Sequence, residues 1–252
     1  MSQMELNLMS RVLGMRMDIN LILPEREKTD CWRVLWLMHG GHGDHHNWLR
    51  KTRIRQIAEE RGLAVVMPGV HASCFVNMKN GLRYGDYVAL ELPAVLRSLF
   101  PKMGRERIQN YIAGFSNGGY GSLYLGLSYP QVFGAIGAMA AGDQADNPYE
   151  ADGSEQAENR ELMFGKGDIS QTPYSIKYLG GELLKQNVPL PYIFHACGRF
   201  DPWLDKNLLV RNFFEKLEGN PYHYYFRMYS EHAHTASCRM EAVQDFLEHI
   251  GW

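Results

Sequence analysis

A serine lies between two glycines at a spacing that suits an activated hydroxyl nucleophile. Residues 114–118 read G-F-S-N-G, a G-x-S-x-G pentapeptide, and an apolar run, 111–113, precedes them. Where a strand turns sharply into a helix, such a serine stands at the strand's C-terminal end, and the flanking glycines let strand and helix pass closely. We therefore predict that Ser116 is a nucleophile and not part of a glycine-rich turn without chemistry.

A serine hydroxyl needs a base to remove its proton and a carboxylate to orient that base. In chains with this pentapeptide the order is serine, acid, histidine. Asp201 follows the apolar run 192–196 and is the predicted acid, whereas Asp205 is better placed to cap the next helix. The base belongs between the last strand and the last helix, where both His232 and His234 stand. The residues leave that choice open, and two exposed loop histidines are the alternative.

A tetrahedral intermediate also needs N–H donors aimed at its developing negative charge. We expect one donor to be the backbone N–H of Asn117, at the start of the helix after Ser116. The other is assigned to the N–H of Gly41, in the loop that follows the apolar run 34–38. Glycine allows the backbone to approach a substrate closely at this point.

The loop around Gly41 is rich in potential metal ligands. It contains His39, His42, Asp44, His45 and His46. A metal site is therefore the competing interpretation, but the spacing matches no zinc-hydrolase pattern such as H-E-x-x-H, and no separate carboxylate cluster completes it. We predict no metal and no cofactor, and expect residues 44–48 to form a loop and the start of a helix.

Short apolar runs alternate with helical patterns, which indicates an α/β fold with a mostly parallel, doubly wound sheet and helices on both faces. We expect strands at 17–23, 33–38, 63–67, 111–115, 135–140, 192–196 and 222–229. Helices are expected at 88–99, 209–217 and 240–250. Pro93 must kink or restart the first of these, and Gly219 is the expected C-cap of the second.

One segment departs from the rest in composition. Residues 143–161 contain seven acidic residues and one basic residue, and they lie between two predicted core strands. Doubly wound folds accept insertions there, so residues 143–190 are expected to form a small cap over the site or a solvated excursion without a role. We expect residues 1–252 to form a single domain.

Composition excludes several classes of function. The formal net charge of −2 gives no electrostatic reason to bind nucleic acid or an anionic membrane. The four cysteines include no C-x-x-C pair, so neither a zinc knuckle nor a disulfide framework is indicated. Residues 1–13 lack the apolar run of a secretory signal, and no stretch reaches the roughly 18 apolar residues of a membrane span. We expect a cytoplasmic protein that acts on a small molecule; a homo-oligomer is left open.

Further motifs, in order along the chain, resemble the esterase family that includes esterase D, and within it the bacterial tributyrin-type acetyl esterases of the α/β-hydrolase superfamily. The matching segments are 12–15, 20–24, 37–41, 47–48, 84–87, 91–93, 113–121 and 197–198 with Asp201. The resemblance covers residues 10–140 and 190–250 and implies an α/β-hydrolase fold. The acidic insertion is not matched.

The resemblance implies triad roles for Ser116, Asp201 and one of the two histidines, with Gly41 and Asn117 as oxyanion donors. Methionine is common in the family where this chain has Asn117, a change that a backbone donor tolerates. The family's G-G-H-E/D-W segment is replaced by 230–235. In the related esterases the base keeps a set spacing from a leucine of the last helix. That spacing, counted back from Leu247, selects His234 over His232.

The predicted function is that of a serine carboxylesterase acting on small, short-acyl esters through an acyl-enzyme. S-formylglutathione hydrolysis, or another thioesterase reaction, is the alternative with the same triad. A catalytically inactive binding module with a hydrolase fold is the alternative from another class. A cysteine nucleophile at Cys74 or Cys197 is disfavoured, because neither has an adjacent base or a helix N-terminus evident in the sequence.

Overall fold

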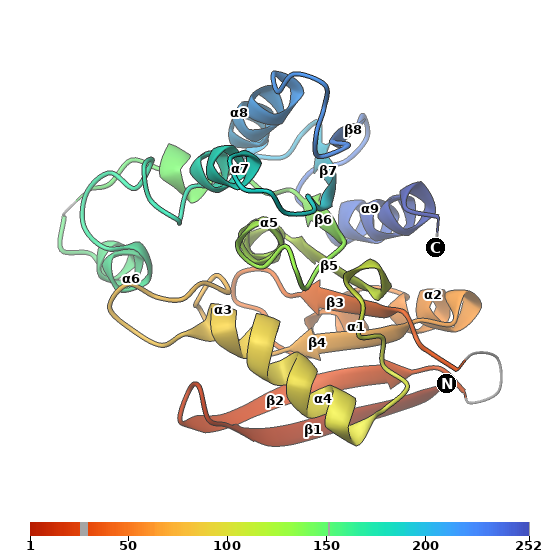
Figure 1. The fold of residues 1–252 in the computed structure, drawn as a ribbon. Helices are drawn as coiled ribbons and strands as arrows, with labels where there is room; N and C mark the ends of the chain where they lie inside the picture. Colours follow the sequence, from red (N-terminus) through yellow and green to blue (C-terminus); the bar gives the residue numbers. More distant parts are fainter. Residues whose placement is uncertain (26–29, 151, 252) are drawn as a thin grey trace.

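A computed structural model of the chain describes residues 1–25, 30–150 and 152–251. These residues form one eight-stranded sheet in the order β1-β2-β4-β3-β5-β6-β7-β8 (Figure 1). The strands are β1 Ser2–Ser10, β2 Met15–Leu23, β3 Val34–Met38, β4 Ala64–Pro68, β5 Asn110–Phe115, β6 Ala135–Met139, β7 Tyr192–Gly198 and β8 Tyr225–Tyr229. Strands β3 to β8 are parallel, and the β1–β2 hairpin joins the sheet through antiparallel pairing of β2 with β4.

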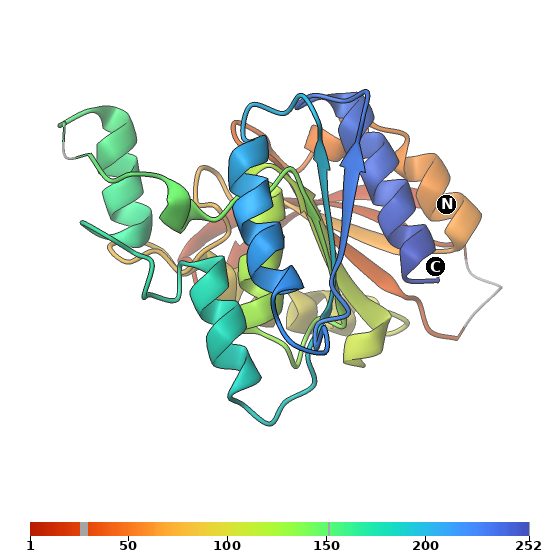
Figure 2. The same ribbon diagram turned by 90° about the horizontal axis from the view of Figure 1, so that it is seen from above.

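Helices lie on both faces of this sheet (Figures 1 and 2). They are α1 Asn47–Lys51, α2 Ile54–Arg61, α3 Tyr84–Asp86, the π-helix η1 Tyr87–Glu91, α4 Leu92–Leu99, η2 Arg107–Gln109, α5 Asn117–Ser128, η3 Gln144–Asp146, α6 Glu155–Phe164, α7 Ile176–Leu184, α8 Leu204–Glu215 and α9 Ala236–His249. The buried apolar residues of α4, α5, α7 and α8 join one core cluster, and those of α1, α2 and α9 join another. The sheet therefore separates two hydrophobic cores, as expected of an α/β-hydrolase fold.

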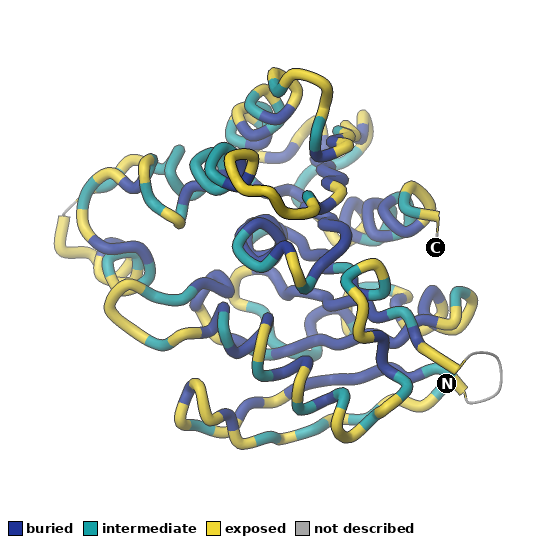
Figure 3. The backbone as a smooth tube through the Cα atoms, viewed as in Figure 1, coloured by how far each residue is buried: buried dark blue, intermediate teal, exposed yellow. Residues whose placement is uncertain are grey.

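Strand β3 shows why the apolar runs predict the centre of the sheet. All five of its residues are buried. Val34, Trp36 and Met38 belong to the core on one face, and Leu35 and Leu37 to the core on the other. Alternate side chains of a strand point to opposite faces, so a strand covered on both faces must be apolar throughout. Figure 3 shows the central strands buried.

All seven predicted strands are present, with their ends shifted by up to three residues. Strand β1 is an addition that the prediction lacks. Met4, Leu6 and Leu8 are its half-buried positions, and the residues between them are exposed. This period-two alternation is typical of a sheet covered on one side, and it contains no continuous apolar run.

Two of the helix predictions concern a proline inside a helix and a glycine at a helix end. The α-helix restarts at Leu92 after a π-helical turn, with Pro93 in its first turn, as Pro93 requires. The predicted cap at Gly219 is wrong, because α8 ends earlier, with Lys216 as its C-cap. Gly219 has φ +71° and supplies a left-handed turn beyond the helix. Among the described residues, no helix has the length and apolar character needed to cross a membrane.

Candidate active site

Ser116 occupies the sharp turn between β5 and α5. Its backbone has φ 61° and ψ −124°, a strained conformation for a residue with a side chain. Two hydrogen bonds hold the turn: the Ser116 N–H donates to the Met139 carbonyl at 2.8 Å, and the Tyr120 N–H donates to the Ser116 carbonyl at 3.0 Å. The serine is therefore fixed at the C-terminal end of a central parallel strand, where α/β folds bind ligands.

The two flanking glycines are required by close backbone contacts. A Cβ atom on Gly114 would lie 2.3 Å from the Gly118 carbonyl oxygen. A Cβ atom on Gly118 would lie 2.4 Å from the carbonyl oxygens of both Met38 and His39. Real Cβ atoms do not approach so closely, so the pentapeptide pattern follows from packing of α5 against β3 and β5.

Asp201 lies in the loop after β7 and is 5% exposed. Its Oδ1 accepts the Trp203 N–H at 2.9 Å, and its Oδ2 lies 2.7 Å from His234 Nδ1. The expectation that Asp205 caps α8 is wrong: Trp203 is the N-cap residue, and Asp205 is an exposed member of the first turn. Of the two aspartates in this region, it is therefore Asp201 whose carboxylate contacts a histidine.

His234 turns its Nδ1 toward Asp201, which leaves Nε2 as the nitrogen for chemistry. Its ring lies 4.5 Å from the Phe115 ring and 4.8 Å from the Trp203 ring, measured between centroids. Because Phe115 immediately precedes Ser116, the imidazole is next to the nucleophile turn. A buried carboxylate on Nδ1 and apolar rings on either side fix the orientation of the imidazole, as the predicted base requires.

The loop that carries His234 is fastened to the loop that carries Asp201. The Phe200 N–H donates to the His232 carbonyl at 2.9 Å. A Cβ atom on Gly198 would lie 2.4 Å from that same carbonyl oxygen, so glycine is needed at the end of β7. Thr235 then caps α9 by accepting the Cys238 N–H at 3.4 Å. Backbone contacts, and not the side chains alone, bring Asp201 and His234 together.

His232 points into a different set of contacts. Its Nε2 lies 2.7 Å from Glu241 Oε2, and its Nδ1 lies 3.3 Å from Ser237 Oγ. Both of its ring nitrogens are therefore engaged by the first turns of α9. The structure pairs Asp201 with His234 and leaves His232 with Glu241.

The two expected oxyanion donors lie on adjoining segments. A Cβ atom on Gly41 would lie 3.1 Å from the Asn117 side-chain amide. Within the described part of the chain, neither the Gly41 N–H nor the Asn117 N–H has a backbone acceptor. A turn closed by the Gly43 N–H and the Gly40 carbonyl, 3.1 Å apart, shapes this loop.

His39 stabilises this loop through hydrogen bonds to both of its ring nitrogens. Its Nδ1 donates to the Gly40 carbonyl at 2.9 Å, and its Nε2 accepts the Val70 N–H at 3.2 Å. Burial lowers the pKa of His39, so the ring is neutral at physiological pH. His39 is a structural residue, whereas His42 is exposed and His45 and His46 lie beside Glu5.

The sequence matches the family described as "Putative esterase" over residues 10–166. The chain belongs to this esterase family. An acetyl esterase from Caldicellulosiruptor saccharolyticus is 28% identical over 235 residues, covering 87% of this chain and 88% of the relative. An S-formylglutathione hydrolase from Rattus norvegicus is 29% identical over 140 residues, covering 46% of this chain and 48% of that protein.

Solved structures agree with this assignment. The Staphylococcus aureus fluorophosphonate-binding serine hydrolase FphF superposes with a TM-score of 0.88 at 25% identity, covering 99% of this chain and 98% of that one. The S-formylglutathione hydrolase FrmB of the same organism gives 0.84 at 26% identity, with the same coverage. The chain is a carboxylic ester hydrolase with the α/β-hydrolase fold.

Arg239 is a residue of this esterase that sequence reasoning missed. It belongs to α9, is 6% exposed, and donates from Nη1 to Asn47 Oδ1. Its guanidinium lies 4.7 Å from the Phe115 ring and 5.2 Å from the Trp48 ring. Burial lowers its pKa to about 10, so it stays charged at neutral pH. An arginine in an amphipathic helix usually lies on the surface, so nothing in the sequence marks this one.

The insertion between β6 and β7 is anchored beside the esterase site. Tyr120, one turn into α5, donates its hydroxyl to the Tyr174 carbonyl at 2.7 Å. The Tyr174 hydroxyl donates in turn to the Asn77 carbonyl at 2.9 Å. Asp143, at the start of the acidic stretch, is buried and accepts the Ser175 hydroxyl at 2.8 Å. The base of the insertion is therefore held against α5, while α6 extends away from the sheet (Figures 1 and 2).

Proposed function

We propose that this esterase cleaves small esters with short acyl groups, using Ser116, His234 and Asp201 as its triad. The observation that supports this most is the 2.7 Å contact between His234 and the buried Asp201, next to a serine held in a strained turn. The pair supplies the oriented base that a serine hydroxyl requires.

Each step uses one of these groups. Ser116 Oγ attacks the ester carbonyl while His234 Nε2 takes its proton, and Asp201 stabilises the resulting imidazolium. The carbonyl oxygen becomes an oxyanion that accepts hydrogen bonds from the Gly41 and Asn117 N–H groups. The imidazolium then gives its proton to the leaving alkoxide, and the acyl group remains on Ser116. Water, deprotonated by His234, then attacks the acyl carbonyl. The bond between the acyl group and Ser116 Oγ breaks, His234 returns the proton to that oxygen, and the acid is released.

We also propose that the insertion 143–190 acts as a cap that limits the acyl pocket, within a single domain of residues 1–252. The support is its attachment to α5 by an aromatic cluster. Phe164 lies 6.1 Å from Tyr120 and 5.5 Å from Tyr174, measured between ring centroids. These rings pack against α5, the helix that begins after Ser116, so we expect them to restrict long acyl chains.

A thioesterase function is the second candidate, because relatives named S-formylglutathione hydrolase match in sequence and in structure. The same triad attacks a thioester carbonyl. An inactive binding module is disfavoured, because the acid–base pair is intact. We propose the cytoplasm as the site of action, since the cysteines are free and Cys31 is exposed, as suits a reducing compartment.

The test compares purified wild-type protein with Ser116→Ala on p-nitrophenyl esters of graded acyl length and on S-formylglutathione. We expect the acetate ester to be turned over fastest, and Ser116→Ala to lose about 10³-fold or more in kcat/KM with its far-UV circular dichroism unchanged. Ser128→Ala, at the other end of α5, is the matched control. If folded Ser116→Ala retains a tenth of wild-type activity, Ser116 is not the nucleophile.

A further inference from the structure

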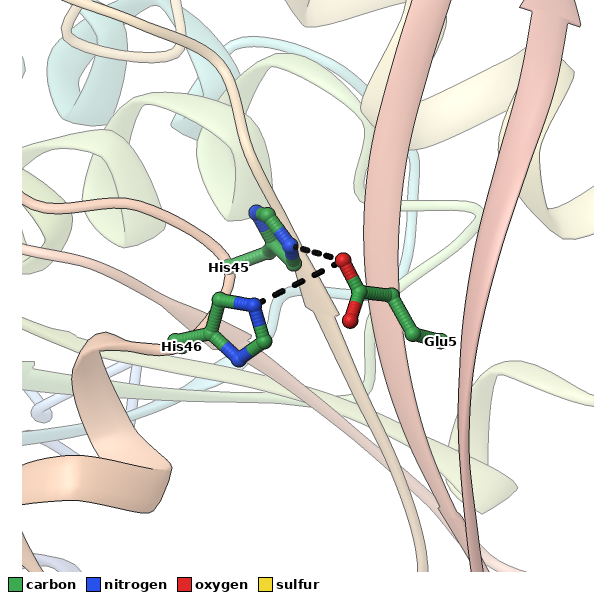
Figure 4. A group of neighbouring side chains, drawn as sticks. All are labelled: Glu5, His45 and His46. Carbon is green, nitrogen blue, oxygen red and sulfur yellow. Dashed lines mark hydrogen bonds and ion pairs between the residues drawn. The ribbon is translucent and has the colours of Figure 1, made fainter.

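Three potential metal ligands from distant parts of the sequence meet outside the triad. Glu5 lies on β1, and His45 and His46 lie just before α1 (Figure 4). His45 Nε2 is 2.8 Å from Glu5 Oε1, and His46 Nε2 is 3.5 Å from the same oxygen. One ligand atom from each residue lies within 4.8 Å of the others. Both imidazoles direct a nitrogen at one carboxylate oxygen.

A buried residue of the sheet holds the side chains of this cluster in place. Glu5 pairs with Asn20 across the β1–β2 hairpin, and directly opposed residues project to the same face of the sheet. Asn20 is fully buried, and its Nδ2 donates to the His45 carbonyl at 3.1 Å and to His46 Nδ1 at 3.0 Å. The two imidazole rings lie 4.1 Å apart. The cluster is thus held by the sheet and does not depend on flexible side chains alone.

Two imidazole nitrogens and one carboxylate form the donor set of many zinc sites, where water takes the fourth position. In contrast to the sequence-based prediction of no metal, we propose that Glu5, His45 and His46 bind one Zn²⁺-type divalent ion through the Glu5 carboxylate and both Nε2 atoms. The side chain of Glu5 is 51% exposed and that of His46 is 33% exposed, so an ion can enter from solvent. The site is separate from the serine chemistry, which needs no metal.

Asn20 supplies a further observation that favours a ligand here. It donates to His46 Nδ1, so the proton of the neutral ring is on Nε2, facing Glu5. A metal needs the Nε2 lone pair, so that proton must move to Nδ1. Asn20 Oδ1 is buried and has no hydrogen-bond partner in the described part of the chain. Turning the amide by half a turn lets Oδ1 accept the new Nδ1–H, at the cost of the bond to the His45 carbonyl. Metal-bound histidines generally have such an acceptor on their second nitrogen.

Metal binding at this cluster would join the β1 edge to the loop that contains Gly41. An exposed ion pair also links Asp44 of that loop to Arg50 of α1 at 2.6 Å. An ion that binds only the folded chain stabilises it by mass action. The expected role is therefore structural: the ion holds the oxyanion loop against the sheet.

The test uses the full chain after chelator treatment and gel filtration. Calorimetric titration with ZnCl₂ should give one ion per chain, and zinc should raise the melting temperature. Co²⁺ should give a visible absorption band that reports nitrogen and oxygen ligands. Loss of an outer-shell partner alone typically weakens a metal site about 10–100-fold, so Glu5→Gln and His46→Gln should each weaken zinc binding at least about tenfold. His249→Gln, an exposed histidine of α9, is the matched control.

Two further variants separate this site from adventitious binding at the histidines of the 230–235 loop. His234→Gln and His232→Gln should keep zinc binding and the thermal shift. The proposal is wrong if zinc binding is absent, if it follows His234 or His232, or if it survives the Glu5→Gln/His46→Gln double variant. Circular dichroism of each metal-free variant confirms that it is folded. Because these readouts do not involve ester hydrolysis, failure here leaves the proposed esterase mechanism standing.

Discussion

Two loops at the same edge of the sheet contain more than one histidine, four in the first and two in the second. One, residues 39–46, follows β3 and leads into α1, and the other, residues 230–235, follows β8 and leads into α9. Parallel strands place both loops at the carboxyl edge where α/β enzymes bind substrates. Their histidines nevertheless have different partners, so position at this edge does not by itself make a histidine a base.

The difference lies in what the two ring nitrogens contact. His39 has both nitrogens occupied by backbone groups, the Gly40 carbonyl and the Val70 N–H. His234 has one nitrogen on the buried carboxylate of Asp201, and we propose that the other accepts the Ser116 proton. A neutral ring with two fixed backbone partners holds a loop in shape. A ring with a carboxylate on one side can accept a proton on the other.

His232 provides a comparison within the second loop. It also has a carboxylate partner, Glu241, but this residue belongs to α9 and is half-exposed. Ser237 contacts its other nitrogen. We propose that the burial of the partner and the freedom of the second nitrogen determine which histidine in these loops acts as the base.

The largest expected effect tests the choice between these two histidines. His234→Ala should lower kcat/KM for p-nitrophenyl acetate about 10³-fold or more, because Ser116 loses its base. His232→Ala should change it little, because the hydrogen bonds of its side chain go to Ser237 and Glu241 of α9 and not to Asp201. Single-turnover acylation of both variants measures the step directly. An inactive His232→Ala beside an active His234→Ala would reverse the assignment.

The next largest effect concerns Asp201, the buried carboxylate whose contact distinguishes His234 from the other histidines of the two loops. Asp201→Asn should lower kcat about 10²–10⁴-fold, because an amide favours the wrong tautomer of His234 and does not stabilise its imidazolium. Asp205→Asn, four residues along and exposed, is the control and should keep near wild-type activity. Equal losses in both variants, or a fully active Asp201→Asn, would contradict a triad through Asp201.

The turn at Ser116 and the sheet were predicted well, because their sequence signals lie within short segments of the chain. Ser116 and its glycines are recognisable since their close contacts, such as Gly118 with the Met38 carbonyl, are demanded by every strand–turn–helix of this kind. The apolar strands are recognisable since burial on both faces requires continuous apolar residues. Strand β1 was not predicted, because burial on one side only leaves an alternation of apolar and exposed residues and no continuous apolar run.

Contacts between distant segments could not be predicted from the sequence. Glu5 lies forty residues from His45 along the chain, and the pairing of β1 with β2, and of β2 with β4, brings them together. Arg239 is likewise buried because α9 packs across Phe115 and Trp48. The sequence predicted two candidate bases and could select between them only by resemblance. Backbone contacts of Gly198 and Phe200 with the His232 carbonyl determine which of them reaches Asp201.

The smallest expected effect tests the structural role of His39. Asparagine can keep a donor near the Nδ1 position but leaves the Val70 N–H without its acceptor. His39→Asn should therefore lower the free energy of unfolding at about pH 7 by roughly 1–3 kcal/mol, the usual cost of a buried unpaired polar group. Activity of the remaining folded protein should fall far less than in His234→Ala. Urea unfolding and steady-state kinetics measure the two quantities.

The same variant should change how stability depends on pH. Because burial lowers the pKa of His39 below 6.5, the unfolded chain binds more protons than the folded one as the pH falls through that value. Wild-type stability therefore decreases below about pH 6.5, and His39→Asn lacks this contribution and should show a shallower decrease. His195, buried with its pKa lowered to about 4, acts in the same direction in both proteins, so the difference between them isolates His39. Parallel urea titrations at about pH 7 and about pH 5 make the comparison, with His249→Gln as the control. If the free energy of unfolding falls equally between these two pH values in His39→Asn and in wild type, His39 is not a buried, neutral support for the loop that contains Gly41.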